Sequence, residues 1–432
     1  MSASPSLATA AQLDAQDPLA SFRQEFHIPP GPDGQPCAYF CGNSLGLQPK
    51  TARAAVEHEF NNWAQLGVEG HFLGDSPWMH YHETLAAATA RLVGASPLEV
   101  VVMNTLTVNL HLLLVSFYRP TGSRYKILME GGAFPSDQYA IESQAHLHGL
   151  DPAEVIVELV PRPGEHTLRT ADIEAKIAEL GDSLATILIG GVNYYTGQVF
   201  DMKAIATAGH AVGALVGFDL AHAAGNIALH LHDWDVDFAC WCSYKYLNSG
   251  PGGTSGVFIH ERFAHRPDLL RLAGWWGHDP AVRFQMKKGF RPMPGAAGWQ
   301  LSCGQIFPMA IHRASLHLLD RAGGMAALRR KSEQLTGYLE TLIRELGLPT
   351  SQLEIITPAD PAQRGCQLSV LVHQRGRELF EHLAAQGIIG DWREPNVIRL
   401  APVPLYNSFA DVQRVGDTLR QFYSEQTVLS ND

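Results

Sequence analysis

From residue 100 onward the chain repeats one hydrophobic pattern, in which short apolar runs alternate with longer amphipathic stretches. The apolar runs have the length of strands, and the amphipathic stretches have the length and spacing of helices. Such alternation is typical of a mainly parallel sheet covered by helices on both faces. The predicted strands are residues 100–103, 126–129, 155–160, 185–190, 215–218, 238–242 and 257–259, and the helices between them are 106–117, 136–148, 171–180 and 201–212.

The segments before and after this region show a different hydrophobic pattern. Proline and glycine signals place helices near 49–66 and 76–93, the first closed by Gly67 and the second by Gly94. After about residue 310 a long helical region leads into two strands and two further helices, which predicts a smaller α+β domain. We therefore expect a disordered leader over 1–15, an N-terminal helical segment over 16–95, a large domain over 96–310 and a small domain over 311–432.

Composition narrows the class of protein. A chain of 432 residues with 46% hydrophobic and 17% charged residues buries a large core. The formal net charge of −11, with no basic cluster, argues against a nucleic-acid partner, and no apolar run is long enough to cross a bilayer. Six scattered cysteines are typical of a reduced, cytoplasmic protein.

The most informative stretch is residues 237–260, in which a buried strand reaches Lys245, breaks into a glycine-rich turn and resumes as a second strand. Lys245 is the only charged residue between Asp237 and His260. Desolvation disfavours its ammonium form, so that the free amine becomes available as a nucleophile and base. A lysine at a strand end beside such a turn suggests a Schiff base with pyridoxal 5'-phosphate (PLP). For an isolated lysine, a surface position would be the better interpretation.

Polar residues that follow other predicted strands supply the remaining parts of such a site, because ligands bind at the carboxyl ends of parallel strands. Thr107 opens a helix whose free amides suit a phosphate. Phe134-Pro-Ser-Asp137 offers an aromatic face and a carboxylate. Asp219 ends an apolar strand, where a protonated pyridine nitrogen would compensate its charge, and His222 follows three residues later.

Two further clusters of polar residues are candidate binding sites. Arg393 and Arg399 flank a C-terminal strand, and either suits a substrate carboxylate. His230-Leu-His232-Asp233 lacks a third ligand motif, so we predict no metal site.

These motifs together resemble kynureninase, a fold-type I PLP enzyme of the aspartate aminotransferase superfamily. The resemblance rests on Tyr39-Phe-Cys-Gly-Asn-Ser-Leu-Gly46, the Phe134 turn, Val216-Gly-Phe-Asp-Leu-Ala-His-Ala223 and Ala239-Cys-Trp-Cys-Ser-Tyr-Lys-Tyr-Leu-Asn248, and it extends over about residues 22–423. It implies a PLP-dependent hydrolase that cleaves the Cβ–Cγ bond of kynurenine or 3-hydroxykynurenine in tryptophan catabolism and NAD precursor supply, as a cytoplasmic homodimer with active sites at the interface.

The resemblance also implies roles for individual residues. Lys245 would form the Schiff base and move the α-proton, and Tyr244 would protonate the departing carbon. Arg399 would hold the substrate carboxylate, and His71 and Cys303 would face the substrate ring. The residues implied around the cofactor are Leu106, Thr107, Phe134, Pro135, Ser136, Asp137, Asp219, His222, Tyr244, Lys245, Trp275 and Cys303, with Trp275 reaching across the dimer interface.

Two residues depart from the family pattern. Gly190 stands where a hydroxyl residue is expected, and Cys303 stands where the animal enzymes carry asparagine. His71 matches the histidine of the animal enzymes, which predicts cleavage of both substrates with a modest preference for the hydroxylated one.

Three alternatives stay open at this point. One is an aminotransferase or a desulfurase of the same fold, although Cys303 and Cys366 lack an obvious setting for a persulfide. Another is a non-catalytic dimeric scaffold, against which the intact Lys245, Asp219 and Arg399 argue. The last is a metal-binding protein that uses the His230 cluster.

Overall fold

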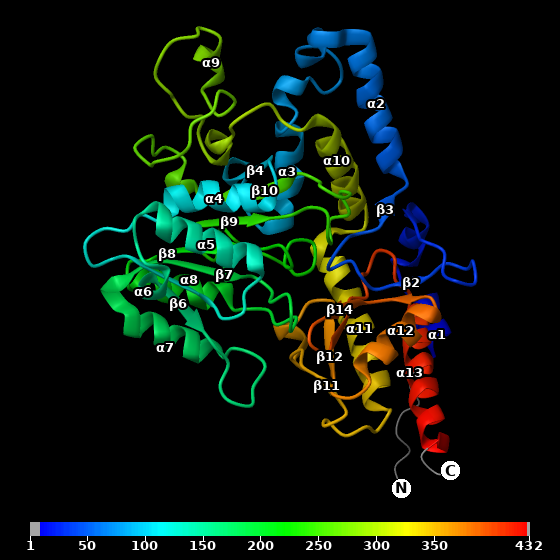
Figure 1. Ribbon diagram of the computed structural model, residues 1–432. Coiled ribbons are helices and arrows are strands. Elements are labelled where there is room, and N and C mark those ends of the chain that lie inside the picture. The colour runs from blue at the N-terminus through cyan, green and yellow to red at the C-terminus, as the bar shows by residue number, and fades with distance from the viewer. Residues whose placement is uncertain (1–8, 430–432) are drawn as a thin grey trace.

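The computed structural model describes residues 9–429 and shows a large α/β domain joined to a smaller α+β domain (Figure 1). The large domain contains a seven-stranded sheet in the order β4-β10-β9-β8-β7-β5-β6. Only β10 runs antiparallel to its neighbours in this sheet, so the predicted mainly parallel sheet is confirmed. The strands are β4 (Val100–Met103), β5 (Lys126–Glu130), β6 (Ile156–Leu159), β7 (Leu184–Gly190), β8 (Leu215–Asp219), β9 (Phe238–Trp241) and β10 (Ser255–Ile259).

Both faces of this sheet are buried, which explains why its strands are continuously apolar in sequence. Along β9, Phe238 and Cys240 join the core on one face, whereas Ala239 and Trp241 join the core on the other. Helices α4 (Leu106–Phe117) and α5 (Pro135–Leu147) contribute to the first core. The helices that contribute to the second core are α3 (Glu83–Val93), α7 (Thr170–Leu180), α8 (Met202–Ala211) and α10 (Ile306–Arg321).

The small domain has a four-stranded antiparallel sheet in the order β11-β12-β15-β14 with its own core. Its strands are β11 (Leu353–Ile355), β12 (Leu368–Val372), β14 (Asp391–Arg393) and β15 (Val397–Leu400), and its helices are α11 (Gly324–Arg344), α12 (Gly376–Ala385) and α13 (Phe409–Leu429). Helix α10 packs on the large domain, and the chain breaks at Gly323 in a left-handed conformation with φ 87°. The division between the two cores therefore lies nearer to Gly323 than to the expected residue 310.

The N-terminal segment contributes to both domains. Strand β2 (Ala38–Tyr39) pairs in parallel with β13 (Ile388–Ile389) and so joins the small domain. Residues Ala10–Ala15 form helix α1, which has a complete capping box at Thr9 and packs on α13. The expectation of a disordered leader therefore fails for residues 10–15, and residues 1–8 lie outside the described part of the chain.

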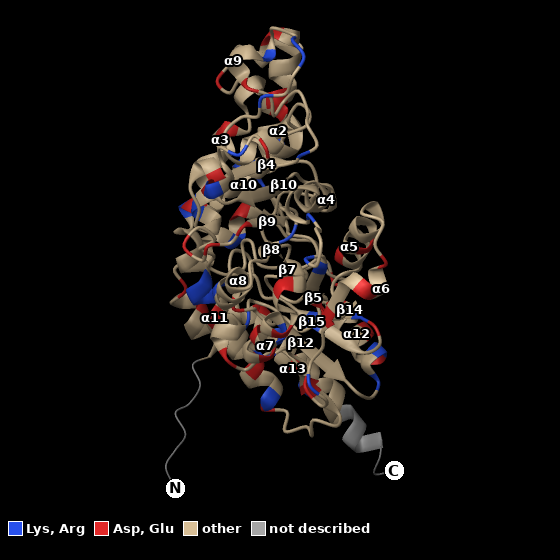
Figure 2. Cartoon of the chain, turned by 90° about the vertical axis from the view of Figure 1, so that its left-hand side faces the viewer, with Lys and Arg blue, Asp and Glu red and all other residues tan. Residues whose placement is uncertain are grey.

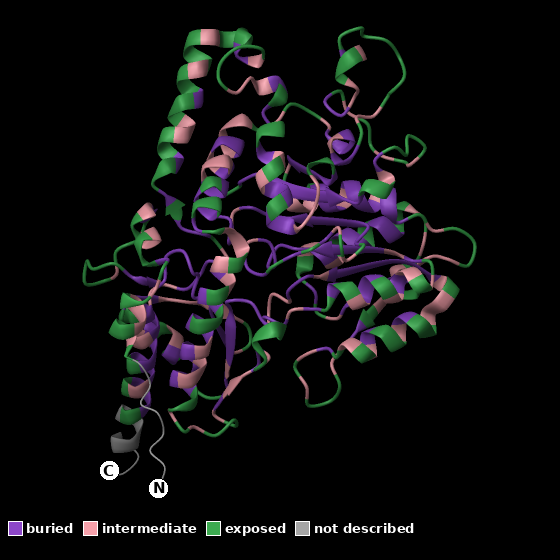
Figure 3. Cartoon of the chain, turned by 180° about the vertical axis from the view of Figure 1, so that it is seen from behind, coloured by how far each residue is buried: buried purple, intermediate pink, exposed green. Residues whose placement is uncertain are grey.

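Helix α2 (Thr51–Leu66) projects from the body and is exposed along most of its length (Figure 3). The remaining short elements are β1 (Phe26–His27), β3 (Gln48–Pro49), α6 (Pro152–Val155) and α9 (Pro280–Arg283). Acidic and basic residues are interspersed over the outer helices (Figure 2). Within residues 9–429 no helix has both the length and the apolar character needed to cross a membrane.

Candidate active site

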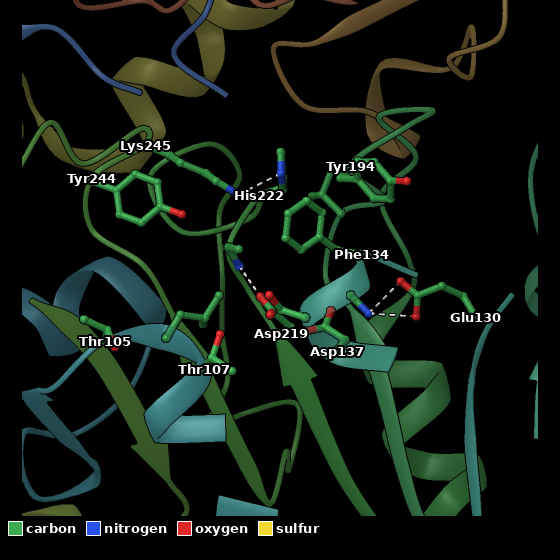
Figure 4. A pocket seen from close by; sticks show the side chains of 15 residues that line it. Thr105, Thr107, Glu130, Phe134, Asp137, Tyr194, Asp219, His222, Tyr244 and Lys245 are labelled. Atoms are coloured by element: carbon green, nitrogen blue, oxygen red, sulfur yellow. Dashed lines mark hydrogen bonds between the residues drawn. The ribbon is translucent and has the colours of Figure 1, made fainter. Parts of the chain in front are cut away.

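A cavity of about 170 Å³ lies at the carboxyl ends of the large sheet, where the polar residues that follow the strands converge (Figure 4). It collects side chains from the ends of β5, β7 and β8, from the turn after β9 and from the first turns of α4 and α5. The lining residues are Thr105, Leu106, Thr107, Glu130, Phe134, Ser136, Asp137, Gly190, Val192, Tyr194, Asp219, Ala221, His222, Tyr244 and Lys245. Nine of the residues that the sequence nominated are thus brought together.

Lys245 is buried at the centre of this arrangement, in the turn between β9 and β10. Its Nζ lies 2.9 Å from Nε2 of His222 and 5.9 Å from the centre of the Phe134 ring. The turn is held from outside by Gly46, whose N–H donates to the Tyr244 carbonyl at 2.8 Å. A Cβ on Gly46 would lie 2.2 Å from the Lys245 carbonyl oxygen, so only glycine permits this approach.

His222 is buried beside the lysine amine. Burial lowers the pKa of its imidazole well below the usual value, and the positive charge of Lys245 lowers it further. The imidazole is therefore neutral, and its Nε2 lies within hydrogen-bonding distance of the Lys245 Nζ.

Asp219 and Asp137 form a buried pair of carboxyls on the floor of the cavity. Asp219 Oδ1 accepts a hydrogen bond from the Ala221 N–H at 2.7 Å. Burial raises the pKa of both groups, and the charge of Asp219 raises that of Asp137 further, to well above its ordinary value. Asp137 therefore carries the proton of the pair, and its Oδ1 is buried without a hydrogen-bond partner among the described residues. Such a pair suits a cationic ring nitrogen.

The opposite side of the cavity suits a phosphate group. Thr105 precedes α4 in an extended conformation (φ −119°, ψ 164°), and its side chain makes no capping hydrogen bond. The side chains of Thr105 and Thr107 therefore line the cavity beside the amides that begin the helix. Tyr244 lines the same space, and burial raises the pKa of its phenol, so that it keeps its proton.

Glu130 and Tyr194 line the cavity as well, although the sequence analysis named neither. Both oxygens of Glu130 lie 3.1 Å from the Gly190 nitrogen, so the N–H of Gly190 faces a carboxylate. Gly190, which stands where the family pattern has a hydroxyl residue, therefore contacts Glu130 through its backbone. Glu130 ends an apolar strand just as Asp219 does, and this shared pattern was the available signal.

Arg399 lies on β15 and is fully buried, but it does not line the cavity. Its Nη1 donates to the Tyr194 carbonyl at 2.7 Å, and its Nε donates to Asp391 at 2.9 Å. Its charge nevertheless lowers the pKa of His222, which places the guanidinium close to the site.

Four other nominated residues do not line the cavity. Pro135 is the first residue of α5, directly after Phe134. Trp275 and Cys303 are exposed on adjacent segments that are linked by the Trp276 N–H and the Leu301 carbonyl. His71 lies beyond α2 and packs edge-on against Trp78, with the ring centres 5.3 Å apart. A single copy of the chain thus leaves Trp275, Cys303 and His71 outside the site.

The histidine cluster is divided by the fold. His230 packs against Trp234, whereas His232 joins Glu99 and His260 beside the first residue of β4. His232 donates to Glu99 at 2.9 Å, and His260 accepts from the Arg262 N–H at 3.2 Å. Protein groups thus already occupy the ring nitrogens that face this cluster.

Comparisons with known proteins agree with this geometry. The family model described as the kynureninase C-terminal domain matches residues 328–419. A kynureninase from Myxococcus xanthus is 58% identical over 95% of this chain and 96% of its own, and one from Koribacter versatilis is 56% identical over 94% and 95%.

Solved structures with the same fold include two PLP-related enzymes. A cysteine desulfurase from Thermococcus onnurineus in its apo form has a TM-score of 0.73 and 17% identity over 89% of this chain and 94% of its own. A C-DES variant with glycine covalently linked to its PLP cofactor has a TM-score of 0.75 and 17% identity over 92% and 98%. At such identity these likenesses show the fold alone.

Proposed function

The chain belongs to the kynureninase family, and from this premise we propose that it hydrolyses the Cβ–Cγ bond of L-kynurenine and L-3-hydroxykynurenine. The products are L-alanine and anthranilate or 3-hydroxyanthranilate. The observation that carries this proposal is the buried Lys245 amine, 2.9 Å from a neutral His222, in a cavity whose floor is the Asp137–Asp219 pair.

The cofactor is pyridoxal 5'-phosphate, whose protonated ring, when bound, stores the electron pair released from the substrate. Lys245 would bond to it covalently, and Asp219 would pair with its ring nitrogen. Phe134 supplies a flat face for the ring, and the start of α4 with Thr105 and Thr107 holds the phosphate. The fit of PLP to this site rests on the buried carboxyl pair. Within the described site, no other planar cation is available to pair with these two carboxyls.

Two side chains of this chain move protons. The Lys245 amine would remove the α-proton of the substrate. Burial keeps the Tyr244 phenol protonated. When the bond between Cβ and the hydrated γ-carbon breaks, Tyr244 donates its proton to Cβ. Water is consumed at that carbonyl, and the two products separate there.

Arg399 orients the substrate through its α-carboxylate. In the structure its guanidinium is committed to Asp391 and to the Tyr194 carbonyl, and its Nη2, 2.7 Å from Asp391 Oδ1, lacks a well-aligned hydrogen bond. A buried donor without an aligned acceptor is available to an incoming carboxylate.

The active form in this proposal is a homodimer in the cytoplasm, in which each copy completes the site of the other. Two exposed segments carry large apolar side chains, the arm formed by α2 and the residues after it and the segment around α9; these side chains are Phe60, Trp63, Phe72, Leu73, Trp275, Phe284 and Met286. Such contiguous apolar surface favours burial against a second copy. Trp275, Cys303 and His71 lie on or beside these segments.

The experiment is product analysis of the purified protein with PLP and L-kynurenine. Equal amounts of alanine and anthranilate are expected, with no need for a keto-acid acceptor. Amino-group transfer to a keto acid without anthranilate would identify an aminotransferase, and sulfide release from cysteine would identify a desulfurase. If PLP produces no visible absorbance band that borohydride can bleach, the protein is a non-catalytic scaffold.

A further inference from the structure

Glu130 is a buried carboxyl of the site that the proposed chemistry does not use. It is 5% exposed, and no Lys or Arg among the described residues forms an ion pair with it. Both of its oxygens converge on the single N–H of Gly190. Burial of a carboxylate is costly unless its charge is compensated, so a position with a purely structural task would favour an amide.

The sheet places Glu130 next to the carboxyl pair. Strand β7 lies between β5 and β8, and its last residue, Gly190, is in register with Asp219. Glu130 and Asp219 therefore flank Gly190, and Figure 4 shows the carboxyls of Glu130, Asp137 and Asp219 along one side of the cavity. A Cβ on Gly190 would lie 2.9 Å from Glu130 Oε1, so the absence of a side chain permits the close approach.

Glu130 also forms part of the wall between two cavities. A second cavity of about 270 Å³ lies behind it and shares only Glu130 and Tyr194 with the active-site cavity. The titratable or charged groups around Glu130 are Asp219 at the end of β8, His222 after β8, Asp137 on α5, Tyr244 and Lys245 after β9, His166 after β6 and Tyr194 and Tyr195 after β7.

We propose that Glu130 is a positioning residue whose negative charge acts through the Asp137–Asp219 pair to strengthen the hold on the positively charged ring of PLP. This inference rests on the proposed function, because it needs the cofactor ring beside Asp219. A negative charge on Glu130, added to that of Asp219, favours the protonated form of the ring without touching it. Burial raises the pKa of Glu130 to about 7, so the charge is present at pH 8.5 and largely absent at pH 6.

The test is the dissociation constant of PLP, measured by absorbance on the full-length chain after removal of cofactor, for wild type and Glu130→Gln at pH 6 and pH 8.5. Glutamine keeps the volume and still accepts from the Gly190 N–H. We expect PLP to bind about tenfold more weakly to the variant at pH 8.5 and equally well at pH 6. The ratio of the two dissociation constants, variant over wild type, cancels every pH dependence that the two proteins share.

The matched control is Glu158→Gln, which removes the same charge from an exposed position on the neighbouring strand β6. It should leave the dissociation constant unchanged at both pH values. Equal ratios for Glu130→Gln at pH 6 and pH 8.5 would overturn the inference while leaving the proposed function intact. Failure of the wild type to bind PLP would overturn both.

A second measurement is the unfolding of the cofactor-free proteins by urea. A carboxyl whose folded pKa lies above its unfolded pKa destabilises the fold as pH rises through the interval between them. The Glu130→Gln protein should therefore gain stability relative to wild type at pH 8.5 and show no gain near pH 4.5. A loss of stability at both pH values would assign Glu130 a purely structural role and would contradict the inference.

Discussion

At the scale of single residues, the site depends on ionisable side chains, which are ordinarily kept out of a protein interior. Lys245, His222, Asp137 and Asp219 are each more than nine-tenths buried. Burial shifts the pKa of His222 downward and the pKa values of the two carboxyls upward, which keeps the imidazole neutral and a proton on Asp137, whereas an ionised Asp219 needs a cationic partner. The cofactor ring is such a partner for Asp219.

Replacement of Asp219 by alanine should separate binding of the cofactor from catalysis. The variant should still form the borohydride-sensitive bond to Lys245, because the amine is unchanged. Its kcat should fall by on the order of a hundred- to a thousandfold, since loss of one electrostatic partner of a developing charge costs about 2.7–4 kcal/mol. Steady-state kinetics on kynurenine give the answer, and a loss below tenfold would exclude Asp219 as the partner of the ring nitrogen.

Recognition of the substrate ring is the second prediction at this scale. His71→Trp should shift the ratio of kcat/KM values toward kynurenine, and Cys303→Asn should shift it toward 3-hydroxykynurenine, because an amide binds a ring hydroxyl better than a thiol does. The ratio is measured for wild type and both variants. An unchanged ratio in either variant would show that the replaced residue does not contact the ring.

At the scale of elements, the sequence predicted the large sheet well because its strands are buried on both faces. All seven strands were identified. The antiparallel direction of β10 was not predicted, since an apolar run carries no sign of direction. The pairing of the two-residue strands β2 and β13 was also beyond reach, because it joins positions about 350 residues apart and depends on tertiary contacts alone.

The residues of the candidate site were likewise predicted only in part. Residues next to recognisable strands and turns, such as Asp219 and Lys245, were found from the sequence. Glu130 follows an apolar run just as Asp219 does, but it lies outside the motifs that carry the family resemblance, and the loop of Tyr194 carries no motif either. Distances between such groups depend on strand order, which the local pattern does not encode.

The contact between the N-terminal loop and the lysine turn can be tested with one glycine. Gly46→Ala places a Cβ 2.2 Å from the Lys245 carbonyl oxygen, so the loop or the turn must shift. We expect a loss of about 1–3 kcal/mol in stability together with weaker PLP binding. Gly337→Ala in α11 is the control, because its Cβ meets no atom within 4 Å and alanine favours helix. Equal stability of the two variants in urea would show that the contact is unimportant.

At the scale of the whole molecule, the described chain leaves Trp275, Cys303 and His71 outside the cavity. The arm that carries α2 and the segment that carries α9 project together from one end of the large domain (Figure 1). Three residues that the family assigns to the site lie on or next to these projections. A second copy would bury their apolar surface and bring those residues to the cavity.

Mixed dimers test this arrangement. Trp275→Ala should lose about tenfold or more in activity, because the indole N–H is a candidate donor to the phosphate. If Trp275 acts across the interface, co-expression of Lys245→Ala and Trp275→Ala chains restores one working site in each mixed dimer, or about a quarter of wild-type activity. Activity no higher than the average of the two parent variants would place Trp275 in the site of its own chain.

The most direct measurement of the account compares wild type with Lys245→Ala, supplied with PLP and L-kynurenine, while anthranilate and alanine are quantified. The wild type should release both in equal amounts, and borohydride should fix the cofactor to the peptide that contains Lys245. The variant should release neither product above the rate without enzyme, since no other described group combines the amine with a place beside Asp219. Near-normal turnover by Lys245→Ala, or a reduced cofactor found on another lysine, would contradict the account.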